Sequence, residues 1–370
     1  MIVGTICLYL LVVLAIGGLS HRLFRGTGED YFVASRTIGP FLLLMSLFGT
    51  NMTAFSILGA SGEAYSHGIG VFGLMASSSA IVIPAIFLFV GTRVWRIGKA
   101  NGYVTQAQFF RDRFQSDWTG LLSFVVMTAL VIPYLLIGVM GGGITANHIT
   151  SGAIPQWVGS LAVCLVVLTY VCFGGLRGTA WANAFQTIVF MVLGAVTVGL
   201  IVSDHGGLST AFDRLRDVSP GLLVREGIYD RVTFASYALI PLSAGVFPHL
   251  FMHWLTARSA ETFRWPIILY PICIALVWLP SVLLGTMGRL DFSDLTGPAA
   301  SGVLVAMINV HAPGLLAGLL AAGVLAAVMS SLDSQVLAVG TMFTQDIVRH
   351  YGFHDRMTEK QQIQYARLFV

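Results

Sequence analysis

The chain has 370 residues, of which 56% are hydrophobic and only 10% are charged, and its net charge at pH 7 is +3. Soluble globular proteins carry about 25% charged residues, and no soluble fold has an interior large enough for this much apolar surface. The composition therefore excludes a soluble protein and predicts an all-α, polytopic membrane protein. No basic stripe suggests a nucleic-acid partner.

Long apolar runs occupy most of the chain. Since a membrane-spanning helix needs about 20 such residues, the runs predict about nine transmembrane helices, at 2–20, 39–66, 71–95, 119–142, 156–174, 180–203, 232–255, 265–287 and 313–338. Between them lie an amphipathic stretch, "NGYVTQAQFFRDRF", a polar loop over 204–231, and the short amphipathic "SGVLVAMINV". The final "EKQQIQYARLFV" predicts a charged inner segment followed by the start of a further helix.

The positive residues set the expected orientation. None precedes the first apolar run, which argues against a cleaved signal peptide. Of the 20 Lys and Arg residues, all but five fall in loops on one side, the exceptions being Arg214, Arg216, Arg225, Arg231 and Arg289. By the positive-inside rule, the N-terminus lies outside a plasma (inner) membrane.

Few reactive groups lie within the spans. The four cysteines have no pairing or metal-ligand spacing and are interpreted as small core residues. Among 17 acidic residues, only Glu63 and Asp333 fall in apolar spans, where acids are candidates for ion or proton coupling. The alternative places Glu63 in water at the outer end of its helix and Asp333 near the inner end of its own.

Two spans carry residues that interrupt helices. The second contains "LFGTNMTAFSILG", and the seventh contains "IPLSAGVFPH". Glycine eases departure from helical geometry, and proline removes a hydrogen-bond donor. Interrupted helices at matching positions of two repeats point to a transporter's binding site, and these two lie five spans apart, as inverted five-helix repeats require. Simple kinks are the alternative.

The ninth span, "GLLAAGVLAAVMSSLDSQ", is rich in small residues, which allow close helix packing. The carbonyl of Ala327 and the hydroxyls of Ser330 and Ser331 also share one helix face. Such uncharged oxygens could hold an alkali cation weakly enough to release it.

Several motifs together resemble the sodium:solute symporter family, over essentially the whole chain: "GEDYFVASR", "GTNMTAFS", "YVTQAQFFRDRF", "FGGLRGTAWANAFQ", "FPHLF" and "AAVMSSLDSQ". The resemblance implies a LeuT-type inverted-repeat fold in one transporter domain. An extra first helix and inner loop would occupy 1–37, the first repeat 38–204, and a partial second repeat 232–370, with the last core helices missing.

The resemblance also implies a Na⁺ site between the second and ninth spans. Its ligands would be the carbonyls of Gly49, Met52 and Ala327 and the hydroxyls of Ser330 and Ser331. Many relatives have Trp-Thr-Asp where this chain has "WAN", which ends at Asn183, and in some relatives that aspartate supports a second Na⁺. We therefore expect one ion per solute, with Asn183 as a candidate coupling position.

The same fold would place a solute beside the ion, in contact with Asn51, Thr53, Phe55, Ser56, Tyr134 and Phe247. A packing aromatic is the alternative for Tyr134. Some relatives have an acid where Asn51 stands. No Lys or Arg is evident for a carboxylate, although a helix N-terminus could substitute. Sugars, amino acids and small organic acids such as pantothenate all remain open.

The leading hypothesis is sodium-coupled symport of a small solute across the plasma membrane. Rivals are a symporter-like input domain of a membrane kinase and a proton-coupled transporter that uses Glu63 or Asp333. An enzyme is least expected, because no nucleophile motif or phosphate loop occurs. His249 and His253 lie four apart without a third metal ligand in sequence, and Arg177 is expected to anchor an inner loop and contact a gate. The oligomeric state is not predicted.

Overall fold

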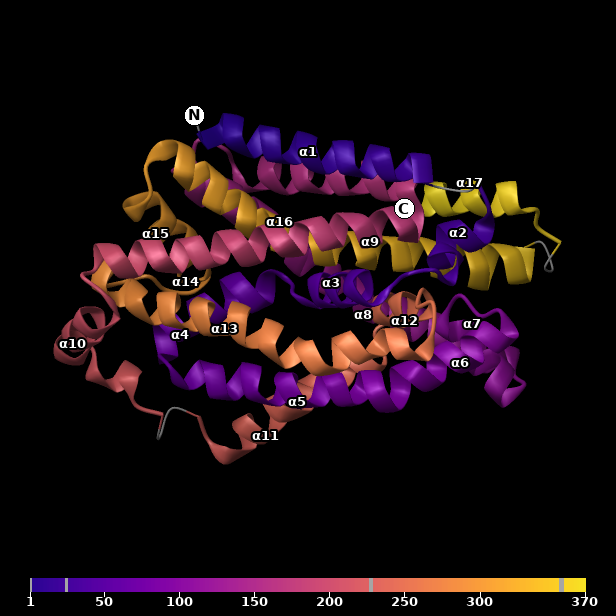
Figure 1. The fold of residues 1–370 in the computed structure, drawn as a ribbon, viewed down its shortest axis with the longest axis horizontal. Helices are drawn as coiled ribbons and strands as arrows, with labels where there is room; N and C mark the ends of the chain where they lie inside the picture. Colours follow the sequence, from indigo (N-terminus) through magenta and orange to yellow (C-terminus); the bar gives the residue numbers. More distant parts are fainter. Residues whose placement is uncertain (1, 24–25, 226–228, 353–355) are drawn as a thin grey trace.

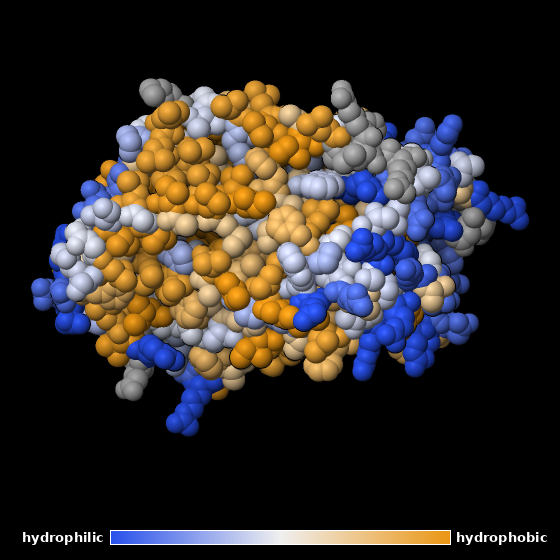
Figure 2. Space-filling model, in the orientation of Figure 1, coloured by the Kyte–Doolittle hydropathy of each residue, from blue (hydrophilic) through white to orange (hydrophobic). Residues whose placement is uncertain are grey.

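The computed structural model describes residues 2–23, 26–225, 229–352 and 356–370, and over these ranges the chain is helical, with an isolated bridge between Ile38 and Ala257 and no strand. Six of the described helices are long and apolar enough to cross a membrane, and each bent pair described below could add one, for up to eight. The long helices run roughly along one axis of the molecule (Figure 1). Hydrophobic side chains cover its middle, and hydrophilic ones gather most densely at the right-hand end (Figure 2).

The six long helical segments match predicted spans, with α9 covering two of them. They are α1 (Ile2–Leu23), α8 (Asp117–Ile149), α9 (Gln156–Asp204), α13 (Arg264–Asp291), and two composite helices. One composite joins η3 (Phe72–Ala76), α5 (Ser77–Ile86), η4 (Phe87–Gly91) and α6 (Thr92–Asn101). The other joins α16 (Gly314–Met342) to η8 (Phe343–Gly352).

Both predicted interruptions are confirmed as bends. α3 (Pro40–Asn51) meets η2 (Phe55–Gly59) and α4 (Ala60–His67) at 63°. The second break separates α11 (Arg231–Leu239) and η6 (Ile240–Gly245) from α12 (Pro248–Leu255), with a bend of 45°. α12 begins at Pro248, where a missing N–H costs no helical hydrogen bond.

The 49 residues of α9 form two arms, not one rod. A straight helix of that length would extend about 74 Å, more than twice the hydrocarbon thickness of a bilayer. Gly175 has φ 55° and ψ −158°, a conformation that glycine adopts readily. The adjacent residues Asp333 and Ser334 bond Tyr170 and Asn183, one on each arm, so the chain reverses at Gly175 (Figure 1). The two arms correspond to the predicted fifth and sixth spans, and each bent pair corresponds to one predicted span.

α8 continues seven residues beyond the predicted end of the fourth span at 142. The glycines there permit close packing and do not end the helix. A Cβ on Gly141 would overlap Ala54, and one on Gly143 would overlap the Gln156 carbonyl. These contacts bring α8 against the first break and against the start of α9.

α16 is the central helix, since 83% of its most apolar window is buried, compared with 22% for α1 at the periphery. The small residues of α16 allow neighbouring helices to pack closely around it. At Gly323, a Cβ would press on Leu193 of α9, and at Gly318 it would meet Thr5 of α1. The small-residue face predicted for the ninth span therefore packs tightly, and it carries the serines discussed below.

Short helices cap the two ends of the molecule. At one end lie α10 (Leu208–Val218), η5 (Pro220–Leu223), α14 (Pro298–Ser301) and α15 (Val303–His311), and at the other lie α2 (Gly28–Val33), η1 (Ala34–Arg36), α7 (Gln106–Phe114), η7 (Ala260–Phe263) and α17 (Glu359–Phe369) (Figure 1). We call these the α15 end and the α17 end. The predicted amphipathic segments form α7 and α15. The division into an extra helix and two repeats stays a prediction.

Candidate ion and solute site

The first break opens where α3 ends at Asn51. Met52 has ψ 93° and leaves the helical region. The side chain of Thr53 accepts a hydrogen bond from the Phe55 amide at 3.1 Å, and its carbonyl accepts one from the Ser56 amide at 3.0 Å. Thr53 therefore satisfies donors that the interruption frees, as a helix cap does. This role explains a polar residue in the middle of an apolar segment.

Three of the five predicted Na⁺ ligands lie together. The Ser330 hydroxyl is 2.9 Å from the Gly49 carbonyl and 3.0 Å from the Ala327 carbonyl, and its side chain is fully buried. One hydroxyl has a single hydrogen to donate, so it cannot make a full hydrogen bond to both oxygens. A cation among the three oxygens would satisfy all of them, which is the chemistry expected of an alkali-ion site.

The other two predicted ligands are buried nearby but are not tied into this cluster. The Ser331 hydroxyl donates to the Val328 carbonyl of its own helix at 3.1 Å. Met52 is 2% exposed, at the non-helical point of the break. Their participation stays a prediction.

Gly49 permits the close approach of three helices. A Cβ at this position would overlap the Thr187 hydroxyl of α9 and lie 3.3 Å from the Asn183 carbonyl and 3.5 Å from the Ser330 Cβ. Thr187 in turn donates to the Met45 carbonyl of α3 at 3.0 Å. A side chain at Gly49 would therefore separate α3 from α9 and α16.

A buried polar network centred on Ser334 adjoins these oxygens. The Asn183 amide donates to the hydroxyls of Thr50 and Ser334, both at 2.9 Å, and those two hydroxyls bond each other. Nε2 of His253 lies 3.1 Å from the Ser334 hydroxyl, which can also donate to Asp333 at 3.0 Å. Each of these five residues is at most 2% exposed. The network joins α3, α9, α12 and α16, including both broken helices.

Of the three predicted coupling residues, the structure brings two together. Asp333 is fully buried and accepts a hydrogen bond from Tyr170 at 2.8 Å, so it does not lie in water at a helix end. Asn183 and Asp333 both bond Ser334, so they belong to the same polar network. Glu63 lies apart on α4 with its side chain 33% exposed, 3.0 Å from His67 and 3.1 Å from the Tyr229 hydroxyl.

A cavity of about 260 Å³ opens beside the first break. Its walls come from both helix breaks and from α3, η2, η3, α5, α8, α11, η6 and α13. They include all six residues that the sequence suggested for solute contact: Asn51, Thr53, Phe55, Ser56, Tyr134 and Phe247. None of the described residues lining it is charged. Because Thr50 belongs to the polar network and Asn51 to the cavity wall, consecutive residues connect the two regions.

Aromatic rings form one wall of the cavity. The Tyr134 and Phe247 rings stack with centroids 5.3 Å apart and planes inclined by 17°, and His249 stacks on Phe247 at 5.0 Å. Phe55 and Trp278 also line the cavity, and their rings meet edge-on with centroids 6.4 Å apart. Asn51 donates to the Tyr270 hydroxyl at 2.6 Å, which holds its amide in place. Tyr134 is therefore a cavity residue that also packs.

Sequence reasoning missed Thr50 and Ser334 and gave His253 no role. The spacing of His249 and His253 was visible, but it suggested only a weak metal pattern. In the structure, His253 joins the network while neither ring nitrogen of His249 has a hydrogen-bond partner among the described residues. No local pattern could have paired His253 with residues of α3 and α16.

At the α17 end, Arg177 ties the turn of α9 to the segment around α2. Its guanidinium bonds the carboxylate of Asp30 with an Nε–Oδ1 distance of 2.8 Å, and it donates to the Ala34 carbonyl and the Thr37 hydroxyl. Asp30 is fully buried. A Cβ on Gly175 would overlap Tyr31, so the "GEDYFVASR" and "FGGLRG" segments fit closely against each other. A gating role for this contact stays a prediction.

A multi-pass helical protein with two broken helices, whose breaks face a buried oxygen cluster and a neighbouring cavity, has the architecture of an ion-coupled secondary transporter. The model of the sodium:solute symporter family matches residues 31–370, and the chain belongs to that family. The family and the fold neighbours are transporters, not enzymes.

Relatives cover the chain almost completely. It is 26% identical over 349 residues to a sodium/pantothenate symporter of Escherichia coli, which spans 92% of the chain and 70% of the relative. It is 25% identical over 351 residues to the uncharacterized symporter YhjB of Bacillus subtilis, with the same two coverages. A sodium/glucose cotransporter of Vibrio parahaemolyticus is 25% identical over 388 residues, covering 93% of the chain and 68% of the relative.

Two solved structures share the fold. A Na⁺-coupled sialic acid symporter in a substrate-bound outward-open state matches with a TM-score of 0.84 at 17% identity, over 100% of this chain and 77% of that one. Mhp1, a nucleobase-cation-symport-1 family transporter, matches with a TM-score of 0.60 at 15% identity, over 91% and 72%. These matches confirm the predicted inverted-repeat transporter fold.

Proposed function

We propose that this protein is a Na⁺-coupled symporter that carries a small organic solute across the plasma membrane by alternating access, with its N-terminus outside. The observation that carries the proposal is the position of the Ser330 hydroxyl between the carbonyls of Gly49 and Ala327. These oxygens belong to a broken helix and to the central helix, so an ion held between them joins two elements. Relatives named as sodium symporters support this assignment.

The proposed Na⁺ ligands are the carbonyls of Gly49, Met52 and Ala327 and the hydroxyls of Ser330 and Ser331. All are neutral, so the ion is released without separating it from a fixed negative charge. Asn183 donates both amide hydrogens to hydroxyls, and its oxygen has no hydrogen-bond partner among the described residues. One neutral oxygen binds a cation more weakly than a carboxylate, which supports one Na⁺ per solute.

The cavity supports a small solute that carries no net charge. Its volume of about 260 Å³ lies just below the range of drug-sized sites, and burying an unpaired charge among uncharged walls is costly. The stacked faces of Tyr134 and Phe247 suit an apolar or sugar-like surface, while Asn51 and Thr53 offer hydrogen-bonding groups. Neutral sugars and zwitterionic amino acids fit best, and a monocarboxylate needs a helix N-terminus or the ion as partner.

Ion and solute are coupled through the first break in this proposal. Gly49 lies on the ion side, and Asn51 lies on the solute side of the same turn. Ion binding fixes α3 against α16 and so holds the cavity wall in its binding conformation, which is coupling through a shared element. The Arg177–Asp30 contact would hold the α17 end closed until the loaded transporter changes state.

Asp333 gives a proton-coupled alternative its only specific support. It is a fully buried acid that accepts hydrogen bonds from Tyr170 and Ser334, and neither of these residues is cationic. Buried membrane acids serve as proton carriers in many transporters. The kinase-input alternative is not favoured, because the relatives reported above are named as symporters and cotransporters.

The test is uptake by the purified protein in proteoliposomes, with a panel of radiolabelled sugars, amino acids and monocarboxylates. Uptake should require an inward Na⁺ gradient and be lost in Ser330→Ala/Ser331→Ala. Ser281→Ala is the matched control, because Ser281 is also buried and donates within its own helix, to Val277 at 2.9 Å. Uptake driven by a pH gradient and indifferent to Na⁺ would instead establish proton coupling.

A further inference from the structure

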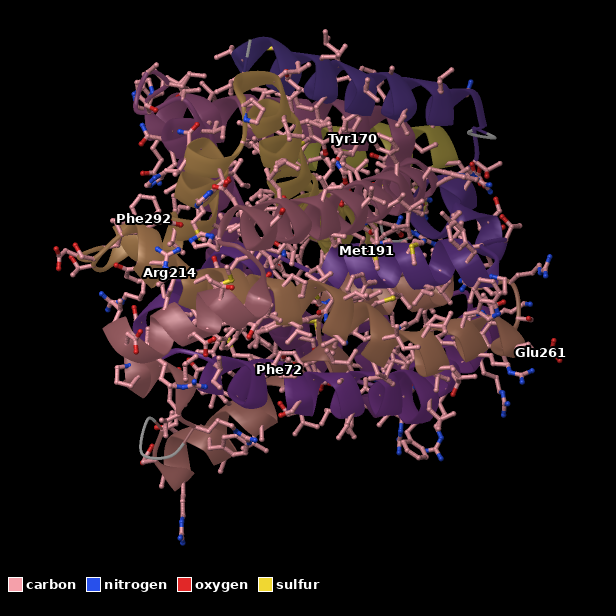
Figure 3. All side chains as sticks on the ribbon, turned by 60° about the vertical axis from the view of Figure 1, so that its left-hand side comes forward. Phe72, Tyr170, Met191, Arg214, Glu261 and Phe292 are labelled. Atoms are coloured by element: carbon pink, nitrogen blue, oxygen red, sulfur yellow. The ribbon has the colours of Figure 1, made fainter. Side chains whose placement is uncertain are left out.

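Three helices end together at the α15 end, away from the ion and solute site. α9 ends with Asp204, which His205 follows, α13 ends with Asp291, and α15 ends with His311. In Figure 3, the labelled residues Phe292 and Arg214 mark this end of the molecule, and Glu261 marks the opposite one. His205, Asp291 and His311 offer ligand atoms that all lie within 4.8 Å of one another.

Both imidazoles direct the same nitrogen at one carboxylate. Nε2 of His205 is 3.3 Å from Oδ1 of Asp291, and Nε2 of His311 is 2.9 Å from Oδ2 of the same side chain. In a tetrahedral zinc site with bonds of about 2.0–2.1 Å, neighbouring ligand atoms are roughly 3.3–3.4 Å apart. The two nitrogen–oxygen separations are therefore near this value, with each histidine facing a different oxygen of Asp291, and the whole set of ligand atoms lies within 4.8 Å.

The other nitrogen of each ring is also engaged. Nδ1 of His205 donates to the Ile201 carbonyl at 2.9 Å, and Nδ1 of His311 bonds the Asp204 carboxylate. Hydrogen bonds of this kind fix the tautomer of a metal-binding histidine and turn its remaining lone pair toward the ion. Two histidines with such partners, converging on one carboxylate, make a prepared set of three ligands.

A purely ionic interpretation accounts for this arrangement less completely. A protonated His311 could bridge Asp204 and Asp291, but His205 would then have to share the same carboxylate. The two rings lie only 4.8 Å apart, and two imidazolium charges at that distance repel. Neutral histidines around a divalent cation avoid this repulsion.

We propose that His205, Asp291 and His311 bind a divalent transition-metal ion of the zinc type, with Asp204 as an outer carboxylate behind His311. The side chains of His205, His311 and Asp291 are 3%, 7% and 15% exposed, so the site is largely enclosed and Asp291 keeps the most contact with the surroundings. A water molecule would complete a tetrahedral set there, as in other three-ligand zinc sites.

The ion would fasten α15 to the ends of α9 and α13. α15 follows α14, and α14 packs on α4, the second half of the first broken helix. A Cβ on Gly62 of α4 would overlap Ser301, and one on Gly288 of α13 would overlap Val303. Alternating access requires helices around the site to move relative to one another. Metal that holds α15 to α9 and α13 should therefore slow uptake, a consequence that rests on the proposed function.

Metal binding itself is measured without transport. The purified, chelator-treated protein is titrated with Zn²⁺ by calorimetry and with Co²⁺ by visible absorption. We expect one ion per chain and the absorption of a tetrahedral Co²⁺ site. His311→Gln and Asp291→Asn should abolish both signals, and Asp204→Asn should weaken affinity by about 10–100-fold, as loss of an outer hydrogen bond does.

His67→Gln is the matched control, because His67 also pairs with a carboxylate, Glu63, at 3.0 Å, but lies outside the cluster. Asp204 is 60% exposed, so its substitution should not impair folding even if the ligand variants do. Absence of stoichiometric binding, or equal affinity in wild type, Asp204→Asn and His67→Gln, would overturn the site. Metal binding without any effect on uptake would overturn only the proposal that the ion restrains α15. If the protein shows no uptake, the proposed transport function fails, and the binding measurement still decides the metal site.

Discussion

The Ser330 hydroxyl lies 2.9 Å from the carbonyl of Gly49, although 281 positions separate the two residues in the sequence. The contact joins the central helix to the first broken helix at the point where helical geometry ends. Neither side chain carries charge, and both residues are buried. The stability of this junction should therefore respond to Na⁺.

Na⁺ should raise the melting temperature of the wild-type protein in detergent, relative to the same concentration of K⁺ or choline, because an ion that binds only the folded state stabilises it. Ser330→Ala removes one ligand and should raise the Na⁺ concentration for half the effect by about tenfold, the equivalent of about 1.4 kcal/mol. Ser281→Ala should keep the wild-type Na⁺ response. Equal Na⁺ responses in all three proteins would exclude Ser330 as a ligand.

Gly49→Ala should destabilise the protein by about 1–3 kcal/mol, because the new methyl group overlaps the Thr187 hydroxyl in a packed interior. Gly199→Ala on α9 is the control, since nothing lies within 4 Å of a Cβ there. Thermal unfolding in one detergent compares the variants. If adding Thr187→Ala to Gly49→Ala partly restores stability, the clash is with the Thr187 side chain. If Gly49→Ala leaves stability unchanged, the close approach of α3 and α9 is not required.

Arg177→Ala should cost about 3–5 kcal/mol, because it removes the guanidinium that neutralises the fully buried carboxylate of Asp30. Arg216→Ala removes an ion pair with Asp213 in which the side chains are 69% and 65% exposed, and it should change stability by less than about 1 kcal/mol. A double-mutant cycle with Asp30→Asn measures the coupling. Additive effects in that cycle would contradict a direct interaction.

Tyr134→Ala should lower the apparent solute affinity by about 2–10-fold, the range expected for loss of one aromatic stacking interaction. Tyr134→Phe keeps the ring against Phe247, which lies 5.3 Å away, and should stay close to wild type. The concentration of solute at half-maximal uptake is the measurement. A large loss in Tyr134→Phe would show that the hydroxyl, not the ring face, contacts the solute.

Asp333→Asn should preserve Na⁺-driven uptake and change stability by less than about 2 kcal/mol, because the amide oxygen can still accept the hydrogen bond from Tyr170. Uptake is measured with a Na⁺ gradient alone and with a pH gradient alone. Wild-type uptake driven by the pH gradient and lost in Asp333→Asn would move the coupling to a proton.

The helix breaks could be predicted because the residues that cause them are consecutive. Gly49 to Thr53 and Pro241 to Pro248 each carry their glycines, prolines and polar groups within one short segment. The six cavity residues were inferred from the family resemblance, and the structure places them together. The reversal of α9 was expected from the separation of two apolar runs, and Gly175 supplies the backbone conformation.

The polar network and the histidine cluster could not be predicted in this way. Thr50, Asn183, His253 and Ser334 come from four helices, and none has a partner at a helical spacing in its own segment. His205, Asp291 and His311 are helix-terminal residues that meet only because three helices of different length end at one level. Such sites depend on tertiary packing, which short-range sequence patterns do not encode.

The uncharged lining of the cavity has an electrical consequence. If a solute without net charge travels with one Na⁺, no fixed charge of the lining compensates the ion, so each turnover moves one positive charge across the membrane. A membrane potential of 100 mV would then contribute about 2.3 kcal/mol to accumulation, in addition to the concentration gradient. The protein would therefore act as a current source, and its uptake would follow the voltage of the cell.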